Sequence, residues 1–99
     1  VSGSSPAFIY MIIEAMADAA VAEGMPRKQA YVFAAQSVLG SAKMVLETGK
    51  HPGELKDAVT SPAGTTIEGV AALERDGLRR AMIDAVRTAA SKSREMSQN

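Results

Sequence analysis

The chain has 99 residues, no Cys, 46% hydrophobic and 4% aromatic side chains, and 11 basic residues balanced by 11 acidic ones. This length predicts one domain, and the hydrophobic content argues against disorder. The zero net charge argues against nucleic acid as the main partner, because phosphates require a basic surface. The absence of Cys excludes disulfides and thiolate chemistry and is compatible with the cytosol. The apolar run at residues 7–13 ends at Glu14, too short to cross a bilayer, so no membrane partner is expected.

A first helix is expected after Ser4 or Ser5, with Pro6 in its first turn and Gly24 followed by Pro26 at its end. Apolar residues recur at helical spacing on one side of it. They are Ile9, Ile12, Ile13, Met16, Ala17, Ala20 and Val21. Glu14 and Asp18 lie on the other side and predict a solvated face.

A second helix is expected over residues 26–48, with Gly49 in the left-handed position that ends it. Its middle is apolar on most sides, which indicates burial on more than one side. In so small a chain this means either a central helix or a helix clasped by a second subunit. Gly40, Ser41 and Ala42 form a small-residue patch that another helix could approach closely.

Three shorter elements complete the expected fold. A third helix is predicted over residues 52–59, and a fourth opens with Thr65 or Thr66 and runs to about Arg75, with Glu68 forming a capping box three residues after Thr65. The Asp76-Gly77 turn leads into a last helix from Leu78 to about Ser93, followed by a frayed tail over residues 95–99. No segment alternates like a strand, so the fold class is all-α with about five helices.

The loop at residues 61–66 is the strongest candidate site. It runs into a helix start, where unpaired backbone N–H groups and the positive end of the helix dipole suit a carboxylate or phosphate. The amides of Gly64, Thr65 and Thr66 would bind the anion, and a Thr hydroxyl, which both donates and accepts, would reach a second polar atom. The alternative is an ordinary turn with a helix cap, because Ser, Pro, Gly and Thr are common in turns.

Other chemistry has weaker support. His51 is the only histidine and is best explained as a structural residue at a helix start, so no metal site is predicted. A nucleophile–base pair of His51 with Ser61 lacks the surrounding nucleophile-elbow pattern. The chain contains neither a Gly-x-Gly-x-x-Gly fingerprint nor a P-loop, so by itself it cannot hold a dinucleotide or nucleoside triphosphate in either usual way.

Residues 59–73 read Val-Thr-Ser-Pro-Ala-Gly-Thr-Thr-Ile-Glu-Gly-Val-Ala-Ala-Leu. This stretch closely resembles the signature of pyrroline-5-carboxylate reductase, the enzyme of the last step of proline synthesis. The resemblance extends to residues 2–7, 14–19, 24–27, 34–40 and 51–57, and so covers nearly the whole chain.

The resemblance implies that residues 1–99 are the C-terminal helical dimerisation and substrate-binding domain of a cytoplasmic reductase. Its helices would interleave with those of a second subunit, and the dimers would assemble further, up to a decamer of five dimers. The Rossmann domain that binds most of NADPH or NADH would be absent from this chain. The start at Val1 without a Met looks like the inside of a longer protein, and the chain alone is expected to be inactive.

The resemblance also assigns the site residues. Gly64, Thr65 and Thr66 would give backbone amides to the substrate carboxylate, and the Thr66 hydroxyl, as the catalytic group, would approach the ring nitrogen. Ser61, also substrate-binding, would shape the loop together with its neighbours. The chain departs from many relatives at Ala63, where they carry Gly, and the methyl group restricts the backbone there.

Two other functions stay open. The chain could be an assembly-only helical module without a ligand of its own. It could also be the helical domain of another NAD(P)-dependent reductase acting on an imine or a small acid.

Overall fold

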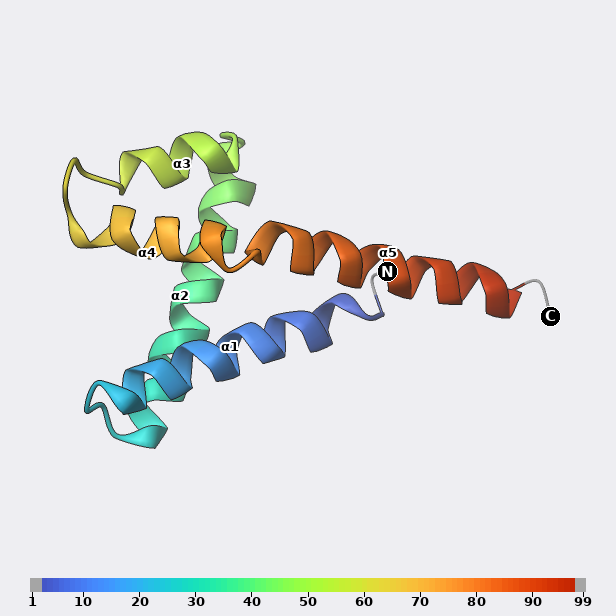
Figure 1. The fold of residues 1–99 in the computed structure, drawn as a ribbon, viewed down its shortest axis with the longest axis horizontal. Coiled ribbons are helices and arrows are strands. Elements are labelled where there is room, and N and C mark those ends of the chain that lie inside the picture. Colours follow the sequence, from blue (N-terminus) through green and yellow to red (C-terminus); the bar gives the residue numbers. More distant parts are fainter. Residues whose placement is uncertain (1–2, 98–99) are drawn as a thin grey trace. The chain divides into compact units, whose positions relative to one another are not determined.

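The computed structural model describes residues 3–97, and this part of the chain contains five α-helices and no strand (Figure 1). The helices are α1 (Ser5–Ala22), α2 (Arg27–Thr48), α3 (Pro52–Ala58), α4 (Thr65–Arg75) and α5 (Leu78–Ser97). The all-α prediction is confirmed, and most helix ends lie within a residue or two of the predicted positions. The chain divides into two units: α1 and α2 belong to the first (Pro6–Pro52), and nearly all of α3 and the whole of α4 and α5 belong to the second.

A Schellman motif ends α1 and turns the chain toward α2. Gly24 has a φ of 108°, its N–H donates to the carbonyl of Val21 at 2.9 Å, and the Met25 N–H donates to the carbonyl of Ala20 at 3.0 Å. These two bonds satisfy carbonyls that the helix end would otherwise leave unpaired. Pro26 is then the N-cap residue of α2, which begins one residue later than predicted.

The first unit has a small core of Ala17, Ala30 and Ala34, all essentially inaccessible to solvent. Alanine side chains let the two helices approach closely but bury little apolar area. Partly buried side chains pack around this cluster, and these are Ile13, Ala20, Val21 and Met25. The hydrophobic side chains of this unit are therefore mostly left outside its core.

A polar contact closes the α1–α2 corner. The guanidinium of Arg27 donates a hydrogen bond to the carboxylate of Asp18 and lies 5.8 Å from the centre of the Tyr31 ring. The bond to Asp18 raises the pKa of Arg27 above its ordinary value. Asp18 and Glu14 are exposed, which confirms the predicted solvated face of α1.

Large apolar side chains of α1 and α2 are exposed to solvent. Tyr10 is 64% exposed, Phe33 is 57% exposed and Leu46 is 83% exposed. Over its whole length, α2 buries only Ala30 and Ala34 among its described residues. Within the first unit, therefore, α1 covers only part of α2.

The helix α1 also meets the length and composition expected of a membrane span. Its 18 residues have a mean hydropathy of 1.4, and 6% of them are buried. The sequence prediction considered only residues 7–13, whereas the helix includes Glu14 and Asp18 and continues through Ala-rich turns to Ala22. Core helices of soluble proteins have the same length and hydropathy, so this feature is weak evidence for a membrane.

In the second unit, α4 and α5 are joined by a tight turn at Asp76 and Gly77. Gly77 has a φ of 82°, and Arg79 bonds to Glu74 across the turn at 2.8 Å. The helix α5 runs to Ser97, so the prediction of a frayed tail is wrong for residues 95–97. The Ser97 hydroxyl donates to the carbonyl of Ser93 at 3.0 Å and Lys92 pairs with Glu95 at 4.0 Å, which supports this last turn. Residues 98 and 99 lie outside the described part.

Candidate functional site

The loop between α3 and α4 leaves α3 through a set of local hydrogen bonds (Figure 1, yellow). The N–H groups of Val59 and Thr60 donate to the carbonyls of Lys56 and Asp57, at 3.2 and 3.1 Å. The Thr60 hydroxyl donates to the Lys56 carbonyl at 2.5 Å. These bonds fix the direction in which the chain enters residues 61–66.

Residues 61–64 form a hydrogen-bonded β-turn. The Gly64 N–H donates to the Ser61 carbonyl at 3.2 Å, and Ala63 has a φ of 59°. Pro62 has its φ locked near −65° by its ring. A positive φ at the third position of such a turn, after a proline, corresponds to a type II turn, which normally takes Gly at that position.

The helix α4 begins directly after this turn without a side-chain cap. Gly64 is its N-cap residue, with φ −83° and ψ −178°, and no side chain within the described residues caps it. The predicted capping box is wrong, because Thr65 is the first helical residue rather than the cap and Glu68 is therefore one position too far along. The cap position instead belongs to a glycine that has no side chain to offer.

The uncapped start leaves backbone donors available. The first N–H groups of a helix have no acceptor within it, and here these belong to Thr65, Thr66 and Ile67. Gly64 donates its own N–H to the Ser61 carbonyl inside the turn, whereas Ile67, the third helical residue, adds a free N–H that the sequence prediction did not include. Ile67 could have been predicted from the sequence, because the third residue of a helix also has an N–H without an acceptor in the helix. The side chains of Ser61, Thr65 and Thr66 are exposed, so the amides are not sealed inside the chain.

The crowding at Gly64 comes from the Ser61 side chain and not from its backbone angles. A Cβ built on it would stand 2.5 Å from the Ser61 hydroxyl oxygen, well inside van der Waals contact. Ser61 and Gly64, two of the four predicted site residues, are therefore brought together directly. Their approach keeps the turn narrow immediately before the free amides.

The charge around the loop comes mainly from the backbone. The helix dipole places partial positive charge at the start of α4, and Glu68 is the acidic residue of its first turn. No Lys, Arg or His occurs in residues 60–68. An anion held here would therefore be bound by amides, with hydroxyl groups from Thr65 and Thr66 at its edge.

Two other sites were considered from the sequence, a metal site and a His51–Ser61 pair. The described part of the chain contains no group of three or more His, Asp or Glu side chains placed to hold a metal ion. His51 lies just before α3 and Ser61 lies after it, in the α3–α4 loop.

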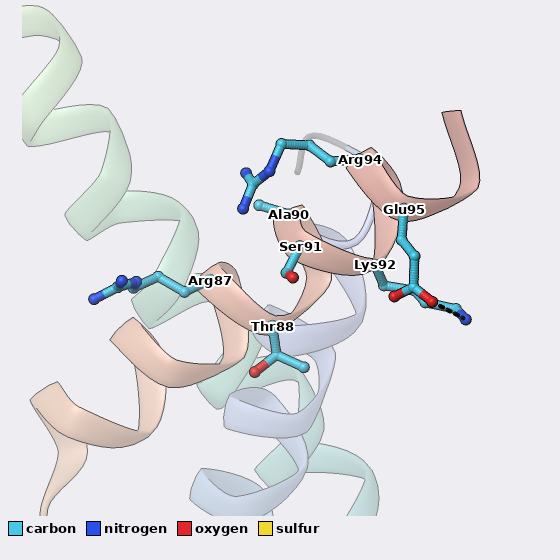
Figure 2. Close-up of a pocket in the computed structure, with 7 residues that line it drawn as sticks. All are labelled: Arg87, Thr88, Ala90, Ser91, Lys92, Arg94 and Glu95. Atoms are coloured by element: carbon cyan, nitrogen blue, oxygen red, sulfur yellow. Dashed lines mark ion pairs between the residues drawn. The ribbon is translucent and has the colours of Figure 1, made fainter. Parts of the chain in front are cut away.

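Among the hollows elsewhere in the second unit, two stand out by volume. One, of about 740 Å³, is lined only by α5 residues (Figure 2). In that view the side chains of Arg87 and Arg94 extend to one side, away from the Lys92–Glu95 ion pair. The other, of about 570 Å³, is an apolar groove lined by Lys56 and by residues of α4 and α5, including Leu73 and Met82. Neither hollow is lined by any of the residues 61–66.

Relatives of this chain share its sequence over almost its full length. Residues 1–96 match the family described as "Pyrroline-5-carboxylate reductase dimerisation". The pyrroline-5-carboxylate reductase of Escherichia coli is 65% identical over 99 residues, and that of Methanosarcina acetivorans is 64% identical over 95 residues. These matches cover 100% and 96% of this chain but 37% and 35% of the relatives, so the chain spans little more than a third of their length.

Solved structures show the same fold. A Plasmodium falciparum pyrroline carboxylate reductase with NADP bound superposes with a TM-score of 0.91 at 35% identity, over 96% of this chain and 36% of that one. A pyrroline-5-carboxylate reductase from Coxiella burnetii gives 0.90 at 40% identity, over 96% and 35%. With its sequence matched over residues 1–96 and its fold shared with these structures, the chain belongs to the pyrroline-5-carboxylate reductase dimerisation family.

Proposed function

We propose that residues 1–99 form the helical dimerisation and substrate-binding domain of a reductase that converts 1-pyrroline-5-carboxylate to L-proline with NADPH or NADH. The observation that carries the proposal is the uncapped, exposed start of α4, which directly follows a turn narrowed by the Ser61–Gly64 approach. The relatives that this chain matches are named as this reductase. Three backbone donors at a helix start match the charge and size of one carboxylate.

In the proposed complex, the amides of Thr65, Thr66 and Ile67 hold the substrate carboxylate. Ser61 and Gly64 shape the turn, and Ser61 also offers a hydroxyl group at its edge. The Thr66 hydroxyl lies beside the ring nitrogen, where it donates to the imine or accepts from the iminium. Fixing both groups at once orients the C=N bond, so the protein contributes mainly positioning.

In this proposal the chain holds the substrate that accepts the hydride, and a different part of the enzyme holds the cofactor that donates it. NADPH or NADH, when bound, supplies the hydride to the C=N carbon. The usual dinucleotide site is built on a parallel sheet with a glycine-rich turn. The described residues contain helices and connecting loops but no strand, and the sequence has no glycine-rich dinucleotide fingerprint. These residues therefore do not fit that site. We therefore assign cofactor binding mainly to a separate N-terminal domain, and expect no turnover from the 99 residues alone.

The proposed partner is a second copy of this chain. The exposed apolar side chains of α1 and α2, such as Phe33 and Leu46, form a surface that a soluble protein normally covers. We further propose that the dimers assemble into larger oligomers, up to a decamer of five dimers. The proposed location is the cytoplasm. Light scattering in detergent-free buffer would measure the assembly, and a monomer under these conditions would contradict it.

A chimera tests the reductase function. The 99 matched residues of the Escherichia coli relative are replaced by this chain, and NADPH oxidation is followed with pyrroline-5-carboxylate. Activity within about tenfold of the parent enzyme is expected, since the carboxylate loop and the dimer surface would be retained. A folded, dimeric chimera with no activity would contradict the substrate role and leave the assembly-only alternative.

The same alternative is tested on the chain as it stands. L-proline, the product, is titrated into the ¹⁵N-labelled chain while its amide resonances are recorded. Shifts confined to residues 61–67 are expected for a carboxylate site. No shift at saturating proline would favour an assembly module, and binding of other small acids but not of proline would favour a different imine or acid reductase.

A further inference from the structure

Ala63 adopts a backbone conformation that its side chain opposes. Its φ of 59° makes it the one non-glycine residue with a positive φ in the described part of the chain. The left-handed region brings Cβ too close to the following carbonyl oxygen, a penalty that corresponds to a factor of about 5 to 30 in population. Glycine has no such penalty.

A second turn geometry is available with the same ends. In a type I turn the residue at the Ala63 position has a negative φ of about −90°, which alanine prefers, and Pro is equally accepted before it. Changing from type II to type I rotates the peptide between Pro62 and Ala63 by roughly half a turn, while the Ser61–Gly64 hydrogen bond can be kept. Alanine therefore brings the type I form close in energy to the type II form that is observed.

The two forms differ in what they present beside the amides of α4. Rotating the peptide exchanges the sides on which the Pro62 carbonyl and the Ala63 N–H lie, and so reverses a local dipole. Thr65 follows only two residues later, at the helix start. An anion at the start of α4 therefore interacts differently with the two forms, and it shifts their populations by that difference.

The rotation changes the ψ of Pro62 and the φ of Ala63, while the φ of Pro62 stays fixed by its ring. Gly64 already lies against Ser61, with an added Cβ only 2.5 Å from the hydroxyl oxygen, and has an extended φ of −83° that any residue adopts. Position 63 is therefore the one whose side chain opposes the type II form and not the type I form.

We propose that Ala63 sets the carboxylate affinity of this site: part of the free protein adopts the type I turn, and ligand binding selects type II. This inference rests on the proposed function of residues 61–67 as the carboxylate site. Ala63 is a positioning residue, because it acts through the loop and not by contact with the ligand. Since only a fraction of the protein is ready to bind, the apparent dissociation constant equals the intrinsic constant divided by that fraction.

The test compares substitutions graded by their tolerance of a positive φ. In the 99-residue chain, Ala63→Gly is expected to lower the dissociation constant for L-proline about three- to tenfold, and Ala63→Val to raise it by a similar factor. In the chimera, Ala63→Gly should lower KM about as much while kcat stays within about twofold. Ala63→Asn, which accepts the left-handed region, should lie between Ala and Gly and replaces the Val variant if that one fails to fold.

A spectroscopic readout reports the turn itself. The nuclear Overhauser effect between the Pro62 Hα and the Ala63 amide proton is strong in a type II turn and weak in type I. It should strengthen when proline is added to the wild-type chain and should be strong in Ala63→Gly without ligand. Ala71→Gly is the matched control: Ala71 is an exposed residue within α4, so its substitution should lower stability and leave proline affinity unchanged.

The outcomes separate the two proposals. If the wild type binds proline and Ala63→Gly changes the dissociation constant by less than twofold, this inference is overturned and the proposed site stands. An Overhauser effect that is already maximal without proline would do the same. Absence of proline binding to every variant would overturn the proposed site, and this inference with it.

Discussion

The hydroxyl oxygen of Ser61 occupies space that a methyl group on Gly64 would need, with 2.5 Å between that oxygen and the position of the missing Cβ. The other atoms near this position are farther away, at 3.4 Å for the Ser61 carbonyl oxygen and 3.8 Å for its Cβ. One hydroxyl group therefore accounts for most of the crowding. This relationship makes the glycine requirement testable by a pair of substitutions.

Gly64→Ala is expected to destabilise the chain by about 0.5–1.5 kcal/mol, because the Ser61 side chain must leave its rotamer or the turn must widen. It should also weaken L-proline binding, since the turn positions the α4 amides. Urea unfolding and isothermal titration measure the two effects. In the double variant Ser61→Ala/Gly64→Ala the clash is absent, and most of the lost stability should return. A double variant no more stable than Gly64→Ala would show that the hydroxyl is not the obstacle.

Thr66→Val tests the proposed catalytic hydroxyl while it keeps the shape of the side chain. In the chimera it should lower kcat/KM by about one to two orders of magnitude, as expected for a lost hydrogen bond to a charged group. Thr66→Ala should act similarly. Steady-state kinetics with pyrroline-5-carboxylate provides the measurement.

Thr60→Val is the matched control for this substitution. It removes the hydroxyl that donates to the Lys56 carbonyl at the end of α3, so it should cost about 0.5–1.5 kcal/mol of stability. Because Thr60 lies outside the proposed site, kcat/KM should be unchanged. Equal kinetic losses from the Thr60 and Thr66 variants would indicate general damage to the loop rather than a catalytic contact.

Phe33→Glu tests the dimer surface. Phe33 is 57% exposed on α2, and a carboxylate there would be buried unpaired if a second copy covers this face. Such burial costs several kcal/mol, so the dimer dissociation constant should rise at least about a hundredfold. Sedimentation equilibrium measures it. Gln36→Glu places the same charge at a polar position of α2 and should change the constant much less; an unaffected Phe33→Glu dimer would place the interface elsewhere.

Substituting alanine for two glycines, Gly49 and Gly69, should change the stability in opposite directions. Gly49 ends α2 with a φ of 67°, and its N–H donates to the Val45 carbonyl, so Gly49→Ala should destabilise by about 1 kcal/mol. Gly69 lies within α4 with nothing within 4 Å of an added Cβ, so Gly69→Ala should stabilise by roughly 0.5–1 kcal/mol. Thermal unfolding of both variants would check this, and a destabilising Gly69→Ala would imply that a partner approaches α4 closely at this residue.

The helices were predictable from the sequence because their ends have strong local signals. Pro26 and Gly49 bracket α2 where they were expected, and Asp76-Gly77 separates α4 from α5. The extent of α5 was not predictable, because its last turn depends on local bonds such as that of Ser97 to Ser93 rather than on apolar periodicity.

The candidate site was predictable in position but not in detail. The residues of the loop indicated a helix start with free backbone amides. The sequence did not decide which of two adjacent residues, Gly64 or Thr65, is the N-cap. In the structure Gly64 is the N-cap, so the predicted capping box is absent, and the Gly64 N–H bonds to the Ser61 carbonyl in the turn. The positive φ of Ala63 is visible only in the structure, since alanine itself gives no such signal in a sequence.

The three alanines between α1 and α2 have a consequence for how this half of the protein forms. Ala17, Ala30 and Ala34 provide too few apolar contacts to offset the entropy of ordering two helices of 18 and 22 residues. In the proposed dimer, most of the hydrophobic driving force comes from the meeting of two chains, so folding and pairing would occur as a single event. The melting temperature should accordingly rise with protein concentration, and dilution alone should favour the unfolded chain.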